Sequence, residues 1–196
     1  MDRAFFNALC RWLIRKEMHP MYALLILDMQ VGLVHGPEKP WRGNELIETL
    51  NTLMDEARRA GAPIFLARHI GPAESPIGPG SPLTMISPEL HLLGDEVVFE
   101  KQRPNAFEST GLAAQLHARA VTGVVITGMK TQYCVDSTCR TARDLGFDTV
   151  LIADGHTTSD TSLLSAEHIV AHHNATLEGP FCRLVQAREW DFQATP

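Results

Sequence analysis

The amino-acid sequence predicts an α/β fold, a three-layer α/β/α domain built on a doubly wound sheet of about six mostly parallel strands. Short aliphatic or β-branched runs alternate with longer segments of helical periodicity, which is the pattern of a parallel sheet covered by helices. The run from Tyr22 to Leu27 is continuously apolar, as expected for a buried strand. A chain of 196 residues is long enough for one domain with a sizeable core and short for two.

The elements follow in order along the chain. The expected strands are 22–27, 63–67, 96–99, 123–127, 149–153 and a last one beginning in 175–178. The expected helices are 44–60, with Asn44 as cap and Gly61 as end, then 109–120, 133–145 before Gly146, and 161–173. The segment 71–88 is rich in Pro and Gly, and we expect a functional loop that borders a pocket. Right-handed crossovers should connect the strands.

Residues 1–20 are predicted to form a helical N-terminal extension, followed by a single domain over 21–196. They combine apolar positions at helical spacing with four basic residues. They are too short and too charged to span a bilayer, and they lack the order of a secretion signal. Three interpretations remain open: a helix that packs on the domain or a second subunit, a peripheral membrane contact, or a dispensable segment before Met18 or Met21.

Charge and cysteine spacing argue against a nucleic-acid partner and against a zinc site formed by these thiols. The formal net charge is −6, and no run of Lys and Arg is long enough to follow a phosphate backbone, so we expect no nucleic-acid partner. The four cysteines, Cys10, Cys134, Cys139 and Cys182, are scattered, which favours a reduced, cytoplasmic setting. Cys134 and Cys139 lack the spacing of a structural zinc site. No metal, no cofactor and no membrane partner are predicted.

Three reactive residues follow strands that end at one edge of the predicted sheet, where ligands bind in this fold class. Asp28 follows the first strand, Lys101 the third, and Cys134 opens the helix after the fourth. Singly, each has an ordinary explanation: an Asp caps a loop, a Lys is solvated, and a Cys is a small buried residue. Their convergence at one edge favours a catalytic site.

Cys134 is the predicted nucleophile. A helix N-terminus and the Lys101 ammonium both favour thiolate over thiol, so we expect the sulfur to be ionised near neutral pH. Asp28 could take the thiol proton, pass it to a leaving amine, and later activate water. The loop GMKTQY before Cys134 offers backbone N–H groups to an oxyanion.

Three motifs carry a family resemblance: LLILDMQ, FEKQRPNAF, and GVVITGMKTQYCVDSTCRTARDLGFDTVLIADGHTT. From about Tyr22 to Asn174 the chain resembles the isochorismatase-like cysteine hydrolase superfamily, which includes nicotinamidases and N-carbamoylsarcosine amidohydrolases. The resemblance implies a triad of Asp28, Lys101 and Cys134 on a six-stranded parallel sheet. It also implies a cis peptide bond between Met129 and Lys130, oxyanion donors at the N–H groups of Lys130 and Cys134, and a homodimer or homotetramer.

Departures from the family pattern narrow the activity. Isochorismatases of this superfamily lack the nucleophilic Cys and cleave a vinyl ether, so Cys134 favours amide-type hydrolysis. Where nicotinamidases carry an Asp-x-His metal cluster, this chain has Ala67-Arg68-His69, and a lone His is also common as an ordinary loop residue. The segment from Asp154 is similar to a subgroup resembling streptothricin hydrolases, and its Asp154, Thr157 and Asp160 are expected to fix a loop and cap a helix.

The predicted function is a cysteine-dependent hydrolase that cleaves an amide, lactam or ureido C–N bond of a small molecule through a thioester. The predicted substrate-binding residues, whose aromatic members could equally serve the core, are Gln30, Trp41, His69, Phe107 and Tyr133. One alternative is a catalytically silent binding or scaffold protein of the same fold. Another is a redox role for Cys134 with Cys139, which lie about 7.5 Å apart along a helix axis, a separation that strains a disulfide.

Overall fold

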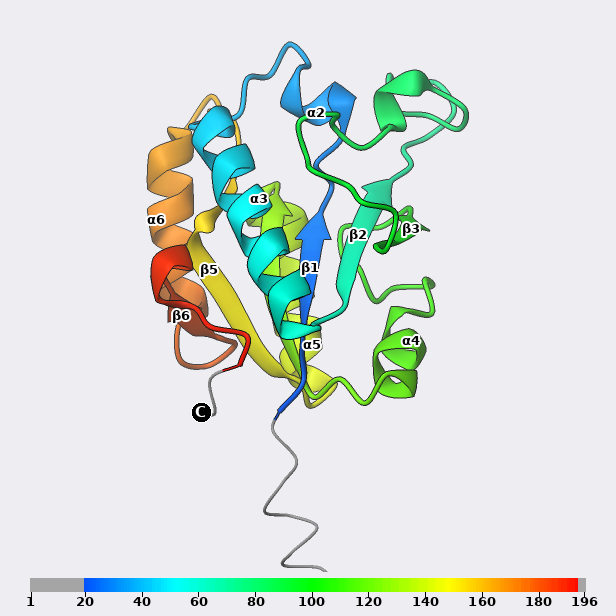
Figure 1. Ribbon diagram of the computed structural model, residues 1–196. Coiled ribbons are helices and arrows are strands. Elements are labelled where there is room, and N and C mark those ends of the chain that lie inside the picture. The colour runs from blue at the N-terminus through cyan, green and yellow to red at the C-terminus, as the bar shows by residue number, and fades with distance from the viewer. Residues whose placement is uncertain (1–19, 194–196) are drawn as a thin grey trace, which may run out of the picture.

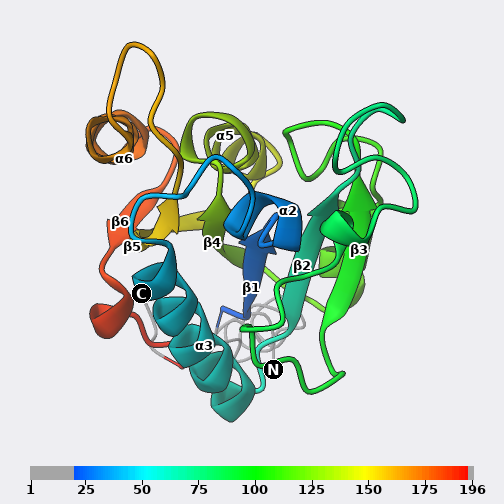
Figure 2. The ribbon, with the colours of Figure 1, turned by 90° about the horizontal axis from the view of Figure 1, so that it is seen from above.

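The computed structural model describes residues 20–193 and contains a six-stranded, all-parallel sheet (Figures 1 and 2). The strand order is β3-β2-β1-β4-β5-β6, so the direction of winding reverses between β1 and β4. The predicted fold class is therefore confirmed, whereas the predicted helix within 1–20 lies outside the described residues apart from Pro20. The strands are β1 (Tyr22–Leu27), β2 (Ile64–His69), β3 (Val97–Lys101), β4 (Gly123–Met129), β5 (Asp148–Thr157) and β6 (Arg183–Val185).

Helices cover both faces of this sheet (Figure 2). The α-helices are α2 (Val31–Val34), α3 (Gly43–Ala60), α4 (Leu112–Ala118), α5 (Asp136–Asp144) and α6 (Ala166–Leu177). The structure also contains three short helical segments: η1 (Pro82–Thr84), η2 (Thr131–Val135) and η3 (Ala187–Glu189). Among residues 20–193, no helix has the length and apolar character needed to cross a bilayer.

Two hydrophobic cores lie on opposite faces of the sheet because the alternate side chains of each strand point to opposite faces. On one face, the buried stripe of α3, which includes Leu50 and Leu53, packs with Leu24 and Ile26 of β1. On the other face, residues of α4 and α5 pack with the intervening β1 residues, such as Leu25. β1 and β4 are buried along their whole length, as central parallel strands require.

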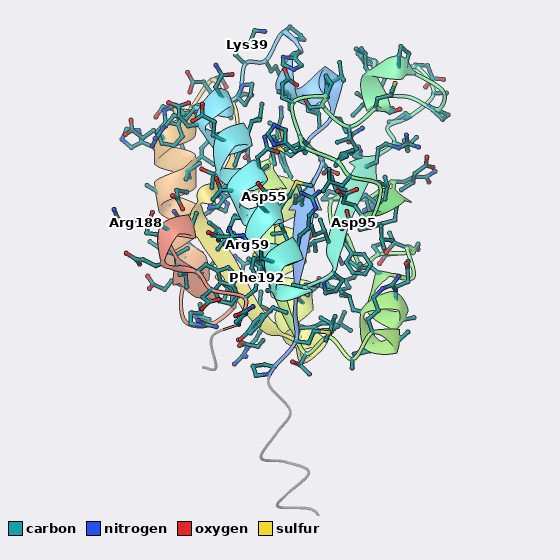
Figure 3. The ribbon with its side chains drawn as sticks, in the orientation of Figure 1. Lys39, Asp55, Arg59, Asp95, Arg188 and Phe192 are labelled. Atoms are coloured by element: carbon teal, nitrogen blue, oxygen red, sulfur yellow. The ribbon has the colours of Figure 1, made fainter. Side chains whose placement is uncertain are left out.

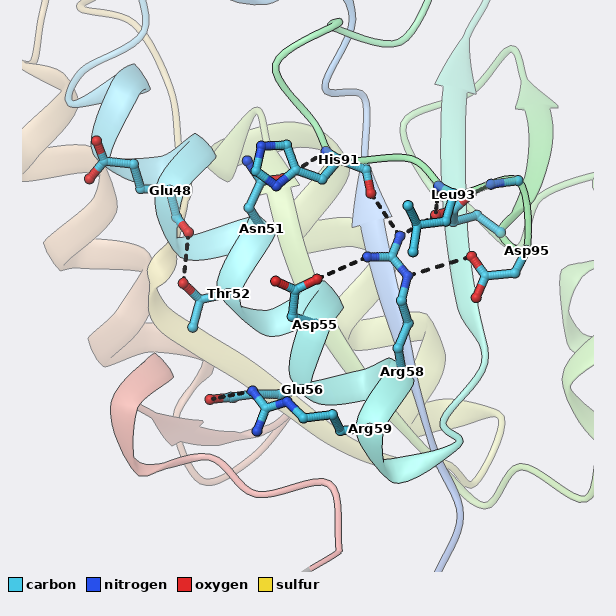
Figure 4. A network of polar contacts seen from close by, with 12 residues as sticks. Glu48, Asn51, Thr52, Asp55, Glu56, Arg58, Arg59, His91, Leu93 and Asp95 are labelled. Atoms are coloured by element: carbon cyan, nitrogen blue, oxygen red, sulfur yellow. Dashed lines mark hydrogen bonds and ion pairs between the residues drawn. The ribbon is translucent and has the colours of Figure 1, made fainter.

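The segment that leads into β3 is tied to α3 by Arg58 (Figure 4). The Arg58 guanidinium lies 3.2 Å from Asp55 Oδ1 and 3.5 Å from Asp95 Oδ1, donates to the His91 carbonyl at 2.8 Å, and also pairs with Glu96. The Arg58 side chain is only 13% exposed, so these contacts are partly shielded from solvent. They help to fix the start of β3, whose last residue is Lys101.

The expected strand beginning in 175–178 is wrong. Residues 175–177 complete α6, and the last strand is β6. α6 extends to Leu177, because this side chain packs into the core formed with α4 and α5. The chain then turns at Gly179, whose φ of +90° is accessible to glycine at little cost, before it re-enters the sheet.

The start of α6 also differs from the expected residue 161. Ser165 is the N-cap and accepts a hydrogen bond from His168 N, while Asp160 Oδ1 accepts one from Ala166 N at 2.7 Å. Both side chains satisfy amides of the first helical turn, which delays the helix to Ala166. The expected capping role of Asp160 is confirmed.

Smaller boundary differences affect the other elements. α3 begins at Gly43, with Arg42 rather than Asn44 as N-cap. α4 is shorter than the expected 109–120, and Lys101 is the last residue of β3 rather than the residue beyond its end. The helix expected at 133–145 begins with the π-helical turn η2.

Candidate active site

The three residues expected to form a catalytic site meet at the carboxyl edge of the sheet. Asp28 follows β1 directly, Lys101 ends β3, and Cys134 lies in η2 between β4 and α5. Lys39 is at the same end of the molecule, toward which the strand arrows point (Figures 1 and 3). Loops and helix N-termini gather at this edge in open parallel sheets, and ligands bind there.

The alternation of β3 directs Lys101 inward. This edge strand exposes Val98 and Glu100 and buries Phe99 and Lys101. Phe99 belongs to the core formed with α4 and α5, and the Cys134 side chain packs against that same core. Residues two apart share a face, so Lys101 is directed toward the side of the sheet from which Cys134 approaches.

The backbone around Asp28 has an uncommon conformation. Its φ of +54° lies in the left-handed region, which costs a non-glycine residue free energy and is enriched at functional sites. Its N–H donates to the Ala67 carbonyl of β2 at 3.1 Å. On the other side of β1, a Cβ atom at Gly128 would lie 2.1 Å from the Leu27 carbonyl oxygen, so only glycine permits this approach of β4.

The η2 turn carries the cysteine. The cis peptide bond predicted between Met129 and Lys130 is present at the end of β4. The N–H groups of Tyr133 and Val135 donate to the Lys130 carbonyl at 3.1 and 3.3 Å, which closes the turn around Cys134. The Cys134 side chain is half-buried at the start of the continuous helix formed by η2 and α5.

The side-chain nitrogen of Lys101 contacts four groups in the site. Its buried Nζ lies 2.7 Å from Asp28 Oδ2 and 3.3 Å from Cys134 Sγ. The same atom lies 3.2 Å from the Arg103 carbonyl oxygen and 3.3 Å from His69 Nδ1. An ammonium group has three protons and accepts none, so four acceptors compete for three N–H groups. The proposed triad residues are thus in mutual contact through Lys101.

The protonation of Cys134 differs from the sequence-based expectation of a free thiolate. Burial, with a smaller contribution from the nearby Asp28 carboxylate, raises the pKa of the Cys134 thiol to about 12, although Lys101 acts in the opposite direction. Desolvation therefore outweighs the effect of the Lys101 ammonium. At neutral pH the sulfur therefore carries its proton.

Asp28 and His69 respond to the same surroundings. Burial raises the pKa of the Asp28 carboxyl, and the charge of Lys101, 2.7 Å away, opposes that rise. Burial lowers the pKa of His69, and the Lys101 ammonium lowers it further. Because Lys101 can only donate, Nδ1 of neutral His69 is the acceptor and its proton is on Nε2.

Gln30, one of the predicted substrate contacts, is fully buried and bonded within the protein. Its amide nitrogen donates to the carbonyls of His69 and Thr84, both at 3.0 Å, and its oxygen accepts from His69 N at 2.7 Å. These bonds join the end of β2 to the 71–88 loop. The side chain thereby braces the backbone of His69.

Trp41 lines a different space from the proposed triad. It borders a cavity of about 340 Å³ between α3, β5 and α6, which His156 and Asn174 also line. Asp28, Lys101 and Cys134 do not line this cavity. The Trp41 backbone is held by Thr157 Oγ1, which donates to its carbonyl at 2.5 Å, in agreement with the loop-fixing role expected for Thr157.

The two remaining aromatic candidates lie in contrasting environments. Phe107 stacks on Phe147 with ring centroids 5.8 Å apart and packs against the same core as Cys134. Tyr133, next to Cys134, is 55% exposed. Tyr133 is therefore available to a ligand, whereas much of Phe107 is committed to packing.

A second buried polar chain reaches η2, and sequence reasoning did not identify it. Thr131 Oγ1 lies 2.9 Å from His156 Nδ1, and His156 Nε2 lies 2.8 Å from Asn174 Oδ1. Asn174 Nδ2 donates to the Ala153 carbonyl at 3.1 Å. The available signal was a histidine inside a segment otherwise typical of a buried strand, in the run ADGHTT.

Within residues 20–193, no group of three or more His, Cys, Asp or Glu side chains has an arrangement that could hold a metal ion. Cys134, Cys139 and Cys182 are free thiols, and the last two are buried. The disulfide considered between Cys134 and Cys139 is thus not formed.

Comparison with known proteins adds a family context to this geometry. A family model described as the isochorismatase domain matches residues 22–178. Streptothricin hydrolase of Streptomyces noursei is 34% identical over 142 residues, which cover 70% of this chain and 50% of that enzyme. The chain thus spans about half the length of this relative.

Two further proteins show similarity over different lengths. Maleamate amidohydrolase of Pseudomonas putida is 35% identical over 75 residues, which cover 38% of this chain and 35% of that enzyme. The crystal structure of an isochorismatase from Pseudomonas putida KT2440 has a TM-score of 0.80 and 28% identity. The match covers 90% of this chain and 95% of that one.

Proposed function

Because the chain belongs to the isochorismatase family, we propose that it is a cysteine-dependent hydrolase that cleaves a C–N bond of a small molecule through a thioester on Cys134. The observation that carries the proposal is the position of Lys101 Nζ, 2.7 Å from Asp28 Oδ2 and 3.3 Å from Cys134 Sγ. A nucleophile, a carboxylate base and a cation that contacts both form the arrangement required for covalent catalysis.

The first half-reaction starts from the thiol rather than from a preformed thiolate. As Sγ attacks the carbonyl carbon, the Asp28 carboxylate accepts the thiol proton, and the C=O electron pair moves onto oxygen. The N–H groups of Lys130 and Cys134 are the proposed donors to that oxyanion. Collapse of the tetrahedral intermediate breaks the C–N bond, and the proton held by Asp28 passes to the leaving nitrogen.

The second half-reaction releases the acid. Asp28 accepts a proton from water, the hydroxide oxygen attacks the thioester, and the C–S bond breaks with return of the proton to sulfur. Lys101 keeps its charge throughout and stabilises the carboxylate and the departing thiolate. The net reaction consumes one water and yields an acid and an amine.

The proposed substrate class is a small amide, lactam or ureido compound. Two relatives support this class by their names: a maleamate amidohydrolase acts on an amide, and a streptothricin hydrolase is a hydrolase. The exposed Tyr133 and the Nε2–H of His69, opposite the nitrogen that faces Lys101, are proposed substrate contacts beside the nucleophile. Gln30 and Phe107 are proposed to shape the surroundings of the nucleophile through the contacts described above, whereas Trp41 borders a separate cavity.

The decisive experiment is a panel of small primary amides, lactams and ureido compounds, maleamate included, assayed for ammonia or amine release. The wild type should turn over at least one compound and yield a mass increase on the Cys134 peptide after rapid quenching. Cys134→Ala should be inactive with an unchanged circular dichroism spectrum, and Cys139→Ala is the matched control thiol. Wild-type activity in Cys134→Ala would refute the cysteine mechanism.

We also propose that the enzyme works as a homodimer or homotetramer. The loop between β5 and α6 projects from the body of the molecule (Figure 2), and it exposes Leu163 by 89% and Leu164 by 51%. Apolar side chains so exposed favour association. Light scattering after size exclusion should give two or four chains for the wild type, and fewer for a variant with Ser at both positions. A monomeric wild type would contradict this assembly.

A further inference from the structure

We propose that Asn174 and His156 are positioning residues that hold the nucleophile turn η2 in place through the hydroxyl of Thr131. This inference deepens the proposed function, on which it rests. It adds to the proposed triad a second, neutral chain of side chains that acts on the turn rather than on the substrate. The chain begins on α6, passes through β5 and ends three residues before Cys134.

The direction of each hydrogen bond follows from the far end of the chain. Asn174 Nδ2 donates to the Ala153 carbonyl, so the amide oxygen of Asn174 is directed at His156 and must accept. His156 Nε2 therefore carries the proton. Its Nδ1 is then an acceptor, and the Thr131 hydroxyl donates to it at 2.9 Å. One neutral tautomer of His156 satisfies every contact in the chain.

These hydrogen bonds are buried, so breaking them costs more free energy than breaking exposed ones. His156 is 3% exposed and Thr131 is fully buried, so neither can exchange its partner for bulk water at low cost. Thr131 is the first residue of η2 and follows the Met129–Lys130 peptide bond by one position. A hydroxyl fixed at this point limits how the turn, and with it the Cys134 sulfur, can move relative to Lys101.

The first test is spectroscopic and needs no substrate. In the ¹⁵N-labelled protein at pH 7, the His156 ring should show a protonated Nε2 and an unprotonated, hydrogen-bonded Nδ1, with the assignment made by loss of the signals in His156→Gln. In Thr131→Val, the Nδ1 resonance should move toward the value of a free acceptor. A protonated Nδ1 in the wild type would overturn the inference.

The second test uses iodoacetamide alkylation of Cys134, followed by mass spectrometry, and kcat on the amide that the wild type cleaves. Thr131→Val should lower kcat by about tenfold or more, with KM changed far less, because misplacement of a nucleophile affects the chemical step. It should also change the alkylation rate of Cys134 severalfold. Thr131→Ser retains the hydroxyl and should restore both values to within about twofold of wild type.

A matched control is available on α6. His172 is exposed, its Nε2 lies 3.4 Å from Thr176 Oγ1 of its own helix, and His172→Gln should leave kcat and alkylation unchanged. Equal kcat and alkylation in wild type, Thr131→Val and His156→Gln would overturn the positioning role. That result, with an inactive Cys134→Ala, would leave the cysteine mechanism intact. An active Cys134→Ala would instead refute the proposed function. The ¹⁵N resonances of His156 would still test the hydrogen bonds from Asn174 through His156 to Thr131.

Discussion

Two chains of buried polar side chains reach the nucleophile turn from opposite sides of β4, and they differ in charge. From β1 and β3 come Asp28 and Lys101, an ion pair with side chains no more than 1% exposed. His156 of β5 and Asn174 of α6 form the second chain and are uncharged at neutral pH. A single tautomer of His156 satisfies all of its hydrogen bonds. A proton acceptor for chemistry requires the first kind of surroundings, whereas holding a backbone turn requires only the second.

The largest expected effect is the loss of the base. Asp28→Asn keeps the shape of the carboxylate but cannot accept the thiol proton, so kcat should fall by about 10³-fold to 10⁴-fold. The same change removes the negative charge that raises the pKa of Cys134. Alkylation of Cys134 by iodoacetamide at pH 8 should therefore become severalfold faster while hydrolysis is lost.

Faster alkylation together with lost hydrolysis in Asp28→Asn would distinguish a catalytic base from a carboxylate with only a structural role. Alkylation is followed by peptide mass spectrometry, with Cys134→Ser as the blank for the other thiols. If alkylation and hydrolysis both fell in Asp28→Asn, the cysteine environment would have been disrupted and the role of Asp28 as a base would lose its support.

Removal of the cation should have the next largest effect, on stability. Lys101→Met leaves a buried Asp28 carboxylate without its ion-pair partner, and breaking a buried pair on one side costs about 3 to 5 kcal/mol. Urea denaturation at pH 7 measures this loss as a lower midpoint. The double variant Asp28→Asn, Lys101→Met should recover most of it because no unpaired charge remains. Equal stability of the single and double variants would contradict the coupling.

His156 should give the neutral chain a measurable acid sensitivity. Burial lowers the pKa of His156 from 6.5 to about 4, so below pH 6.5 the unfolded chain binds a proton that the folded chain does not. Stability from this source is complete above pH 6.5 and falls as the pH decreases toward 4. Between pH 7 and pH 5 the loss should be about 2 kcal/mol.

The His156→Asn variant isolates this contribution, since the difference between its pH profile and that of the wild type cancels the other titrating groups. Those facing His156 include Asp154 and His173. Urea midpoints at pH 5, 6 and 7 are sufficient, and carboxyl groups with lower pKa values then contribute little. Parallel profiles for the two proteins would show that His156 is protonated alike in the folded and unfolded states.

The sequence predicted the charged chain and missed the neutral one, and the reason is physical. Asp28, Lys101 and Cys134 each stand at the end of a strand or the start of a helix, and parallel strands bring those points together. His156 and Asn174 lie inside β5 and α6, where the spacing along the chain does not reveal that a helix crosses a strand at that position. Their contact depends on helix packing, which periodicity alone does not specify.

Protonation was the other point that sequence reasoning could not settle. Position at a helix N-terminus near Lys101 predicted a thiolate, but that argument contained no measure of desolvation. The folded protein places Cys134 against the core formed with α4 and α5, and burial raises its pKa. Likewise, the last strand was misplaced because Ala175 to Leu177 are as suitable for a buried helix end as for a strand.

The smallest expected effect concerns a third contact to the same turn, this one exposed. Lys130, the N-cap of η2, pairs with Glu38, whose side chain is 70% exposed. Solvent screens such a pair, so Glu38→Gln should change the free energy of unfolding by less than about 1 kcal/mol, and less still in 1 M salt. Urea denaturation at low and high salt measures both values. A loss of stability comparable to that of Lys101→Met would show that burial does not determine how much each contact contributes. The contrast between the buried charged, buried neutral and exposed partners of η2 would then be wrong.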